Sequence, residues 1–173
     1  MNKLLTIIIL LLFIIGCGKE TNILKETVTK YDVLLAEGYK TLNMNPLNQA
    51  ATEQRATKAY HHMAALGEAG IKMESTLREL KFLKVKTLSK DKAEVKTEEI
   101  WDYVYLDIKS GKSLFDNTVT YNLKYDLVRK TDRWLVADVT VEKTVEKKSS
   151  QHIFQRPPHE KIMKGMDGEA GKK

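Results

Sequence analysis

The feature that most restricts the fold of this 173-residue chain is a change in the spacing of its apolar residues near residue 80. Before that point, apolar residues recur every three or four positions, which is the period of an amphipathic helix. After it, they alternate with polar residues, which is the period of a half-buried strand. Helices followed by a run of strands predict an α+β domain, with the helices on one face of an antiparallel sheet.

Two helices are expected before the change of period. The first spans about residues 21–43, where apolar residues follow one another at steps of three, four and seven. The second begins at Asn45 and Pro46, which suit an N-cap followed by proline at the first helical position, and it ends near Leu66. A third short helical turn is expected over residues 71–77.

The strands expected after the change are joined by short polar segments, which makes them neighbours in a meander. A polar loop is expected over residues 107–117, and a slip of register near Asp138 in the last strand. The four expected strands span residues 80–88, 93–105, 119–127 and 134–141.

The first residues of the chain have the anatomy of a secretory signal. Lys3 precedes an uninterrupted apolar or small-residue run over residues 4–15, and Gly16 and Cys17 follow. The run is shorter than the roughly 20 apolar residues that a membrane-spanning helix needs. A cleaved or retained targeting segment is therefore expected.

Cys17 is the single cysteine of the chain, and it stands directly after the apolar run and Gly16. The sequence from Ile14 to Cys17, Ile-Ile-Gly-Cys, resembles a lipobox. The resemblance implies cleavage between Gly16 and Cys17, a diacylglycerol on the Cys17 thiol, and often an acyl chain on the new amine. The alternative is a plain signal peptide or a retained anchor with an incidental cysteine.

The lipobox implies an extracytoplasmic protein that is anchored to a bacterial membrane by its lipid. Gly18 differs from the aspartate that marks retention in the inner membrane of many Gram-negative bacteria. An outer-membrane location is therefore expected if the cell has an outer membrane.

The positive charge of the chain is concentrated in its last residues. The net charge is +6, and removal of residues 1–16 with Lys3 leaves 28 basic against 23 acidic residues, or +5. Residues 147–173 carry seven basic and three acidic residues, so the body is close to neutral. Without a basic stripe interleaved with aromatic residues, nucleic acid is not an expected partner. The expected division is a signal peptide (1–16), a lipidated tether (17–24), a domain (25–146) and a basic flexible tail (147–173).

Three segments of the domain, residues 93–101, 120–125 and 133–136, resemble the C-terminal half of NTF2-like domains. Within that superfamily the pattern is most similar to the domain of chloroplast-division proteins and their bacterial relatives. The resemblance implies a curved sheet that closes around a pocket. The aromatic residues that would line the pocket, or alternatively fill the core, are Trp101, Tyr103, Tyr121, Tyr125 and Trp134.

Two short motifs suggest chemistry but lack the spacing that it requires. Gly111-Lys112-Ser113 resembles the end of a phosphate-binding loop, but position 106 is Leu where the motif needs glycine. The adjacent His61 and His62 point about 100° apart on a helix, so one packed and one exposed histidine is expected rather than a metal site. No cofactor is expected apart from the lipid on Cys17.

Glu99 is the candidate catalytic residue, because strand alternation places it on the same face as Trp101. A carboxylate in an aromatic pocket can act as a general base. The leading hypothesis is nevertheless a non-enzymatic lipoprotein that binds a protein partner or a small apolar ligand. The alternatives are an NTF2-like enzyme that uses Glu99, and a structural envelope protein whose tail, with His152 and His159, binds polyanions.

Overall fold

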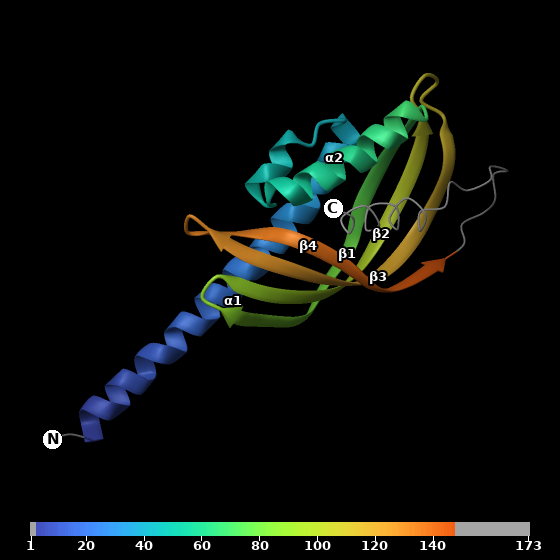
Figure 1. Ribbon diagram of the computed structural model, residues 1–173. Helices are drawn as coiled ribbons and strands as arrows, with labels where there is room; N and C mark the ends of the chain where they lie inside the picture. Colours follow the sequence, from blue (N-terminus) through green and yellow to red (C-terminus); the bar gives the residue numbers. More distant parts are fainter. Residues whose placement is uncertain (1–2, 148–173) are drawn as a thin grey trace, which may run out of the picture.

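The computed structural model describes the backbone of residues 3–147 and the side chains of residues 19–146. Two helices pack on a curved, four-stranded antiparallel sheet of order β1-β2-β3-β4, so the α+β prediction is confirmed (Figure 1). The elements in chain order are α1 (Lys3–Thr41), the 3₁₀ helix η1 (Asn45–Gln49), α2 (Glu53–Glu68), β1 (Ile71–Ser89), β2 (Lys92–Asp107), β3 (Ser113–Lys130) and β4 (Arg133–Lys147).

The helical half of the chain differs from the prediction in where its helices begin. The apolar segment and the first predicted helix form one continuous helix, α1, which extends beyond the sheet at its N-terminal end (Figure 1). Asn45 does not cap the second helix, because it lies in η1. α2 begins only at Glu53, where the Thr52 hydroxyl accepts a hydrogen bond from the backbone N–H of Arg55 at 3.3 Å.

The third helical turn expected over residues 71–77 is wrong, because these residues form the first part of β1. Gly70 ends the turn after α2 with φ +74°, and Ile71 then pairs with Asp107 of β2. Apolar side chains at positions 71, 73 and 77 fit a period of two as well as a helical one. Pairing with β2 therefore decides the conformation of this short segment.

The remaining strands follow the predicted alternation, with one loop shorter than expected. Residues 113–117 belong to β3, so the expected loop over 107–117 is reduced to the segment 108–112. The slip of register near Asp138 is confirmed, because Val136 pairs with Leu127 and Asp138 with Asp126, which leaves one extra residue on β4. β1 has three further irregularities of this kind along its pairing with β2.

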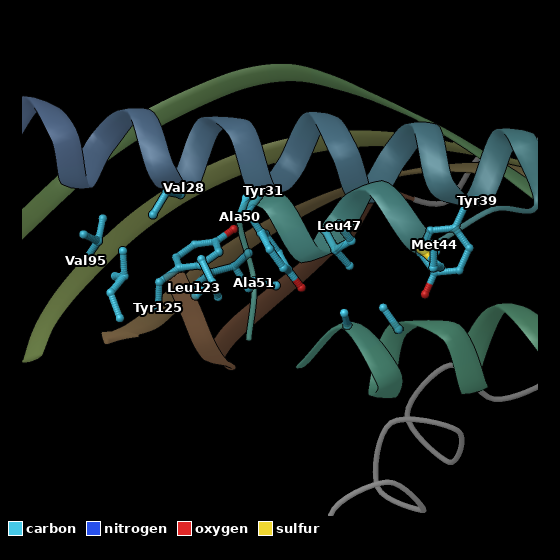
Figure 2. Packing of buried hydrophobic residues seen from close by; sticks show 14 of the residues in the cluster. Val28, Tyr31, Tyr39, Met44, Leu47, Ala50, Ala51, Val95, Leu123 and Tyr125 are labelled. Atoms are coloured by element: carbon cyan, nitrogen blue, oxygen red, sulfur yellow. The ribbon is translucent and has the colours of Figure 1, made fainter. Parts of the chain in front are cut away.

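The core lies between α1 and the side of the sheet that faces the helices. Figure 2 shows Val28 and Tyr31 of α1 opposite Val95 and Tyr125 of the sheet, and all four are buried. On β2 the buried residues alternate strictly with more exposed ones from Ala93 to Trp101. The opposite face of the sheet instead carries ion pairs between neighbouring strands, such as Lys84–Glu94, Lys81–Glu98 and Arg78–Asp102.

Within the described residues, no helix combines the length and apolar character needed to cross a membrane. The side chain of Cys17 and residues 148–173 lie outside the described part. The predictions of a lipidation site and of a basic tail therefore concern regions about which the structure adds no side-chain detail.

Candidate functional site

Glu99 of β2 lies in the core, and its side chain has no exposed surface. Its carboxyl group accepts hydrogen bonds from the Thr97 hydroxyl at 2.6 Å and from the Trp101 indole N–H at 2.7 Å. These two donors are on the same strand, two residues to either side, because alternate residues of a strand share a face. The predicted placement of Glu99 beside Trp101 is thus confirmed, and Glu98 and Asp102 lie on the opposite face.

A third contact joins Glu99 to helix α1. The Tyr125 hydroxyl oxygen of β3 lies 2.8 Å from Oε1 of Glu99 and 2.9 Å from Oδ1 of Asp32. Asp32 belongs to α1 and is almost fully buried. A tyrosine hydroxyl has one proton, so it can donate to only one of the two carboxyl groups. For both contacts to be hydrogen bonds, one carboxyl group must carry a proton and donate it to the tyrosine oxygen.

The surroundings indicate that Asp32 carries this proton. Burial raises the pKa of Asp32 well above its usual range, and the negative charge of Glu99 raises it further. Burial and the two nearby carboxyl groups also raise the pKa of Tyr125, so its hydroxyl keeps its proton. The arrangement is therefore a chain in which Asp32 donates to Tyr125 and Tyr125 donates to Glu99. We refer to Asp32, Thr97, Glu99, Trp101 and Tyr125 as the carboxyl cluster.

The other predicted pocket residues divide into two groups. Tyr103 stacks on Trp101 with ring centroids 6.2 Å apart, and Tyr121 meets Tyr103 edge to face at 6.4 Å. Trp134 lies near the start of β4, where it pairs with Arg129, whereas Tyr121 pairs with Thr144 near the end of that strand. The guanidinium carbon of Arg129 is 4.7 Å from the ring centroid of Trp134. The predicted pocket is therefore not one site, since Trp134 belongs to a different part of the core.

The aromatic residues beside Glu99 largely fill the space next to it. Trp101 and Tyr125 are 5% and 1% exposed, so neither presents a ring surface to solvent. A shallow hollow occurs elsewhere, along α1, and residues of its lining include Thr29, Val33 and Leu34. The hollow contains none of the predicted pocket residues.

Further polar contacts attach the helices to each other. The Arg55 side chain of α2 donates to the Tyr31 hydroxyl of α1 at 2.7 Å, and Tyr31 meets Tyr125 edge to face. The Tyr39 hydroxyl lies 2.6 Å from Nδ1 of His62, which is buried, whereas His61 is exposed. The expectation of one packed and one exposed histidine is therefore confirmed. No group of three or more metal-ligating side chains occurs among the described residues.

The N-terminal end of the described side chains is also fixed to the sheet. Glu20, three residues after Cys17, forms an ion pair with Arg129 of β3 at 2.5 Å. The hydroxyl of Thr87, near the end of β1, donates to Glu20 at 3.5 Å. Leu24, one helical turn later, is fully buried. The segment expected to be a tether is thus a helix that packs on the domain from about Glu20 onward.

Comparison with known proteins shows a likeness at the level of the fold. No family model matches the chain, and no curated protein matches it. Among solved structures, the chain is similar to the intermembrane space region of the chloroplast protein ARC6, with a TM-score of 0.63 and 14% identity over 70% of this chain and 95% of that one. A designed β-sheet protein aligns at 15% identity over 76% of this chain and 96% of that one, but its TM-score of 0.36 carries no weight. The likeness to ARC6 is one of fold.

The sequence interpretation missed two residues of the carboxyl cluster, Thr97 and Asp32. Thr97 shares the face of Glu99 by strand alternation, so the signal for it was the same as for Trp101. Asp32 is the more informative omission. It follows Tyr31 and stands four residues after Val28, so helical spacing already places it on the apolar face of α1. A charged residue on such a face usually has a partner in the core. That signal was present in the sequence, but only the fold identifies Tyr125 and Glu99 as the partners.

Proposed function

We propose that this chain is a bacterial lipoprotein that is cut before Cys17 and anchored by a lipid on that residue, with a non-enzymatic NTF2-like domain that binds a partner outside the cytoplasm. The observation that carries the proposal is the lipobox-like sequence at the end of the apolar run, with the only cysteine of the chain at the cleavage position. A diacylglycerol with a further acyl chain gives stable membrane attachment, at about 0.8 kcal/mol per buried methylene.

The carboxyl cluster gives less support to an enzymatic role than to a structural one. A general base must come within hydrogen-bond distance of its substrate, at about 2.6–3.2 Å. Glu99 has no exposed surface, and three protein donors already occupy its oxygen atoms. The alternative enzyme with Glu99 as general base therefore has less support, and the cluster is better explained as a link between α1 and the sheet.

The NTF2-like assignment is supported by the element order, with helices first and a curved antiparallel sheet after them. The likeness to the ARC6 region supports the same architecture. Tyr103 and Tyr121 are half-buried, and they are the least buried aromatic residues of the predicted pocket. They are therefore the candidates for contact with a protein partner or a small apolar ligand.

The anchor is tested by the mass of the protein purified from membranes of its host. The wild type is expected to lack residues 1–16 and to carry the mass of a diacylglycerol. A Cys17→Ser variant is expected to retain residues 1–16 and to carry no lipid, and a Gly18→Ser variant serves as a neighbouring control that is processed normally. A wild-type protein with residues 1–16 and a free thiol would refute the proposal.

A further inference from the structure

The end of the sheet next to Cys17 carries exposed basic and apolar side chains close to the proposed anchor. Two hairpin tips lie there on either side of α1, the β1–β2 turn and the β3–β4 turn (Figure 1). The backbone N–H of Arg129 donates to the carbonyl oxygen of Asp91 at 3.0 Å, which joins the two hairpins. We refer to residues 86–92 and 130–133 together as the anchor-side tip.

The anchor-side tip is basic although the domain is nearly neutral. It contains five basic residues and two acidic ones, a net charge of +3, whereas residues 17–146 as a whole carry 21 basic and 20 acidic residues. The side chains of the tip are exposed. Its charged residues are Lys86, Lys90, Asp91, Lys92, Lys130, Asp132 and Arg133.

An apolar side chain stands among these lysines. Leu88 is 52% exposed, and it lies two residues from both Lys86 and Lys90. An exposed apolar residue flanked by lysines is the pattern of protein segments that lie in a membrane interface, where the apolar group enters the acyl boundary and the ammonium groups meet phosphates.

The position of the tip relative to the anchor follows from the contacts of Glu20. Because Glu20 contacts both Thr87 and Arg129, the two hairpins reach the level of that residue on α1. Cys17 precedes it by three residues, about 4.5 Å of helix at 1.5 Å per residue. The headgroup layer of a bilayer is about 5–8 Å thick on each side, so a lipid on Cys17 would bring the tip into it.

We propose that the anchor-side tip docks on an anionic phospholipid surface, with Leu88 in the interface and Lys90 and Lys92 among the headgroups; this inference rests on the proposed anchor at Cys17. Docking at the tip would hold α1 and the sheet in one orientation on the membrane.

The opposite end of the sheet offers a matched control. The turn between β2 and β3 also has an exposed apolar residue, Ile108 at 44%, with two exposed lysines, Lys109 and Lys112, close to it. It differs from the anchor-side tip in its distance from Cys17. A probe or a charge change at this turn therefore controls for composition while it removes proximity to the anchor.

The experiment uses the protein purified from membranes of its host and reconstituted in vesicles of phosphatidylcholine, with or without phosphatidylglycerol. An environment-sensitive fluorophore is attached to a cysteine in a Leu88→Cys or an Ile108→Cys variant, and spin-labelled lipids report its contact with the bilayer. The expected result is a blue shift and quenching at position 88 with phosphatidylglycerol, and neither change at position 108.

Charge variants test the electrostatic part. Each lysine near an anionic surface contributes about 1 kcal/mol, so Lys90→Gln with Lys92→Gln should lower the ratio of docked to undocked protein by up to roughly 30-fold at low salt. The control pair, Lys109→Gln with Lys112→Gln, should leave that ratio unchanged. Equal quenching at positions 88 and 108, or equal quenching at position 88 without phosphatidylglycerol, would overturn the proposal.

The same samples show separately whether the anchor exists. Mass spectrometry of the labelled chain shows whether Cys17 carries lipid or fluorophore. A labelled Cys17 refutes the lipid anchor, whereas a lipidated Cys17 with no response at position 88 refutes only the docking of the tip.

Discussion

Replacement of Asp32 by asparagine tests the proton that the carboxyl cluster requires. Asparagine has nearly the same shape as a protonated aspartic acid, and its amide N–H can donate to the Tyr125 oxygen as the carboxylic acid does. The substitution therefore keeps the hydrogen bond but removes the titration. Wild type and variant should differ mainly in how their stability depends on pH.

The sign of the effect follows from the raised pKa of Asp32. In the unfolded chain the pKa of an aspartate is about 3.9, whereas in the folded protein Asp32 keeps its proton to higher pH. The folded state then binds more protons than the unfolded state, so the free energy of unfolding falls as pH rises between the two pKa values. The stability that this group contributes is fully present below the unfolded pKa and is lost as pH rises through the folded pKa.

The size of the effect is set by one proton. Its slope is at most about 1.4 kcal/mol per pH unit, and wild type loses stability relative to Asp32→Asn as pH rises from the unfolded pKa to the raised folded pKa. Urea unfolding at a series of pH values, followed by tryptophan fluorescence, measures both proteins. Asp107→Asn is the exposed control, because the pKa of Asp107 is lowered by hydrogen bonds from Ser110 and its contribution has the opposite sign. Equal slopes for wild type and Asp32→Asn would refute the proton assignment.

Two further pairs of variants, both measured by urea unfolding, test the packing of α1 and the N-cap of α2. Leu24→Ala removes a fully buried side chain and should cost about 2–5 kcal/mol, whereas Ile23→Ala, which changes a residue 39% exposed, should cost less than about 0.5 kcal/mol. Similar losses for the two would contradict the packing of this end of α1. Thr52→Ala removes the N-cap of α2 and should lower the free energy of unfolding by about 1 kcal/mol. Thr52→Ser keeps a hydroxyl at this position and should retain most of that stability. An alanine variant as stable as wild type would show that the cap contributes nothing.

The strand half of the fold was predictable because its alternation is long and regular. From Ala93 to Trp101 every second residue is buried, and this alone places Glu99 beside Trp101. The irregularity near Asp138 was also visible, because the apolar period shifts there by one residue. Segment 71–77 was not predictable in the same way, since it is short and becomes a strand only by pairing with β2.

The site was only partly predictable, because its decisive contacts are between residues far apart in the sequence. Asp32 and Tyr125 are 93 residues apart, and no local pattern links them. The aromatic residues share a period but differ in position along their strands, so Trp134 was grouped with Glu99 although the pairing of β4 places it elsewhere. A periodic pattern identifies the face of a strand, whereas the register decides which residues meet on that face.

The bulges in the edge strands β1 and β4 affect how easily the sheets of two copies of this chain can pair with each other. Extra residues interrupt the regular pairing of both β1 and β4, and bulges of this kind disturb the repeating backbone groups that another strand would need for pairing. A chain confined to the plane of a membrane meets its own copies far more often than one free in solution. If the proposed lipid anchor holds this chain on a membrane, irregular edges would allow many copies to share a small area of bilayer without joining their sheets into aggregates.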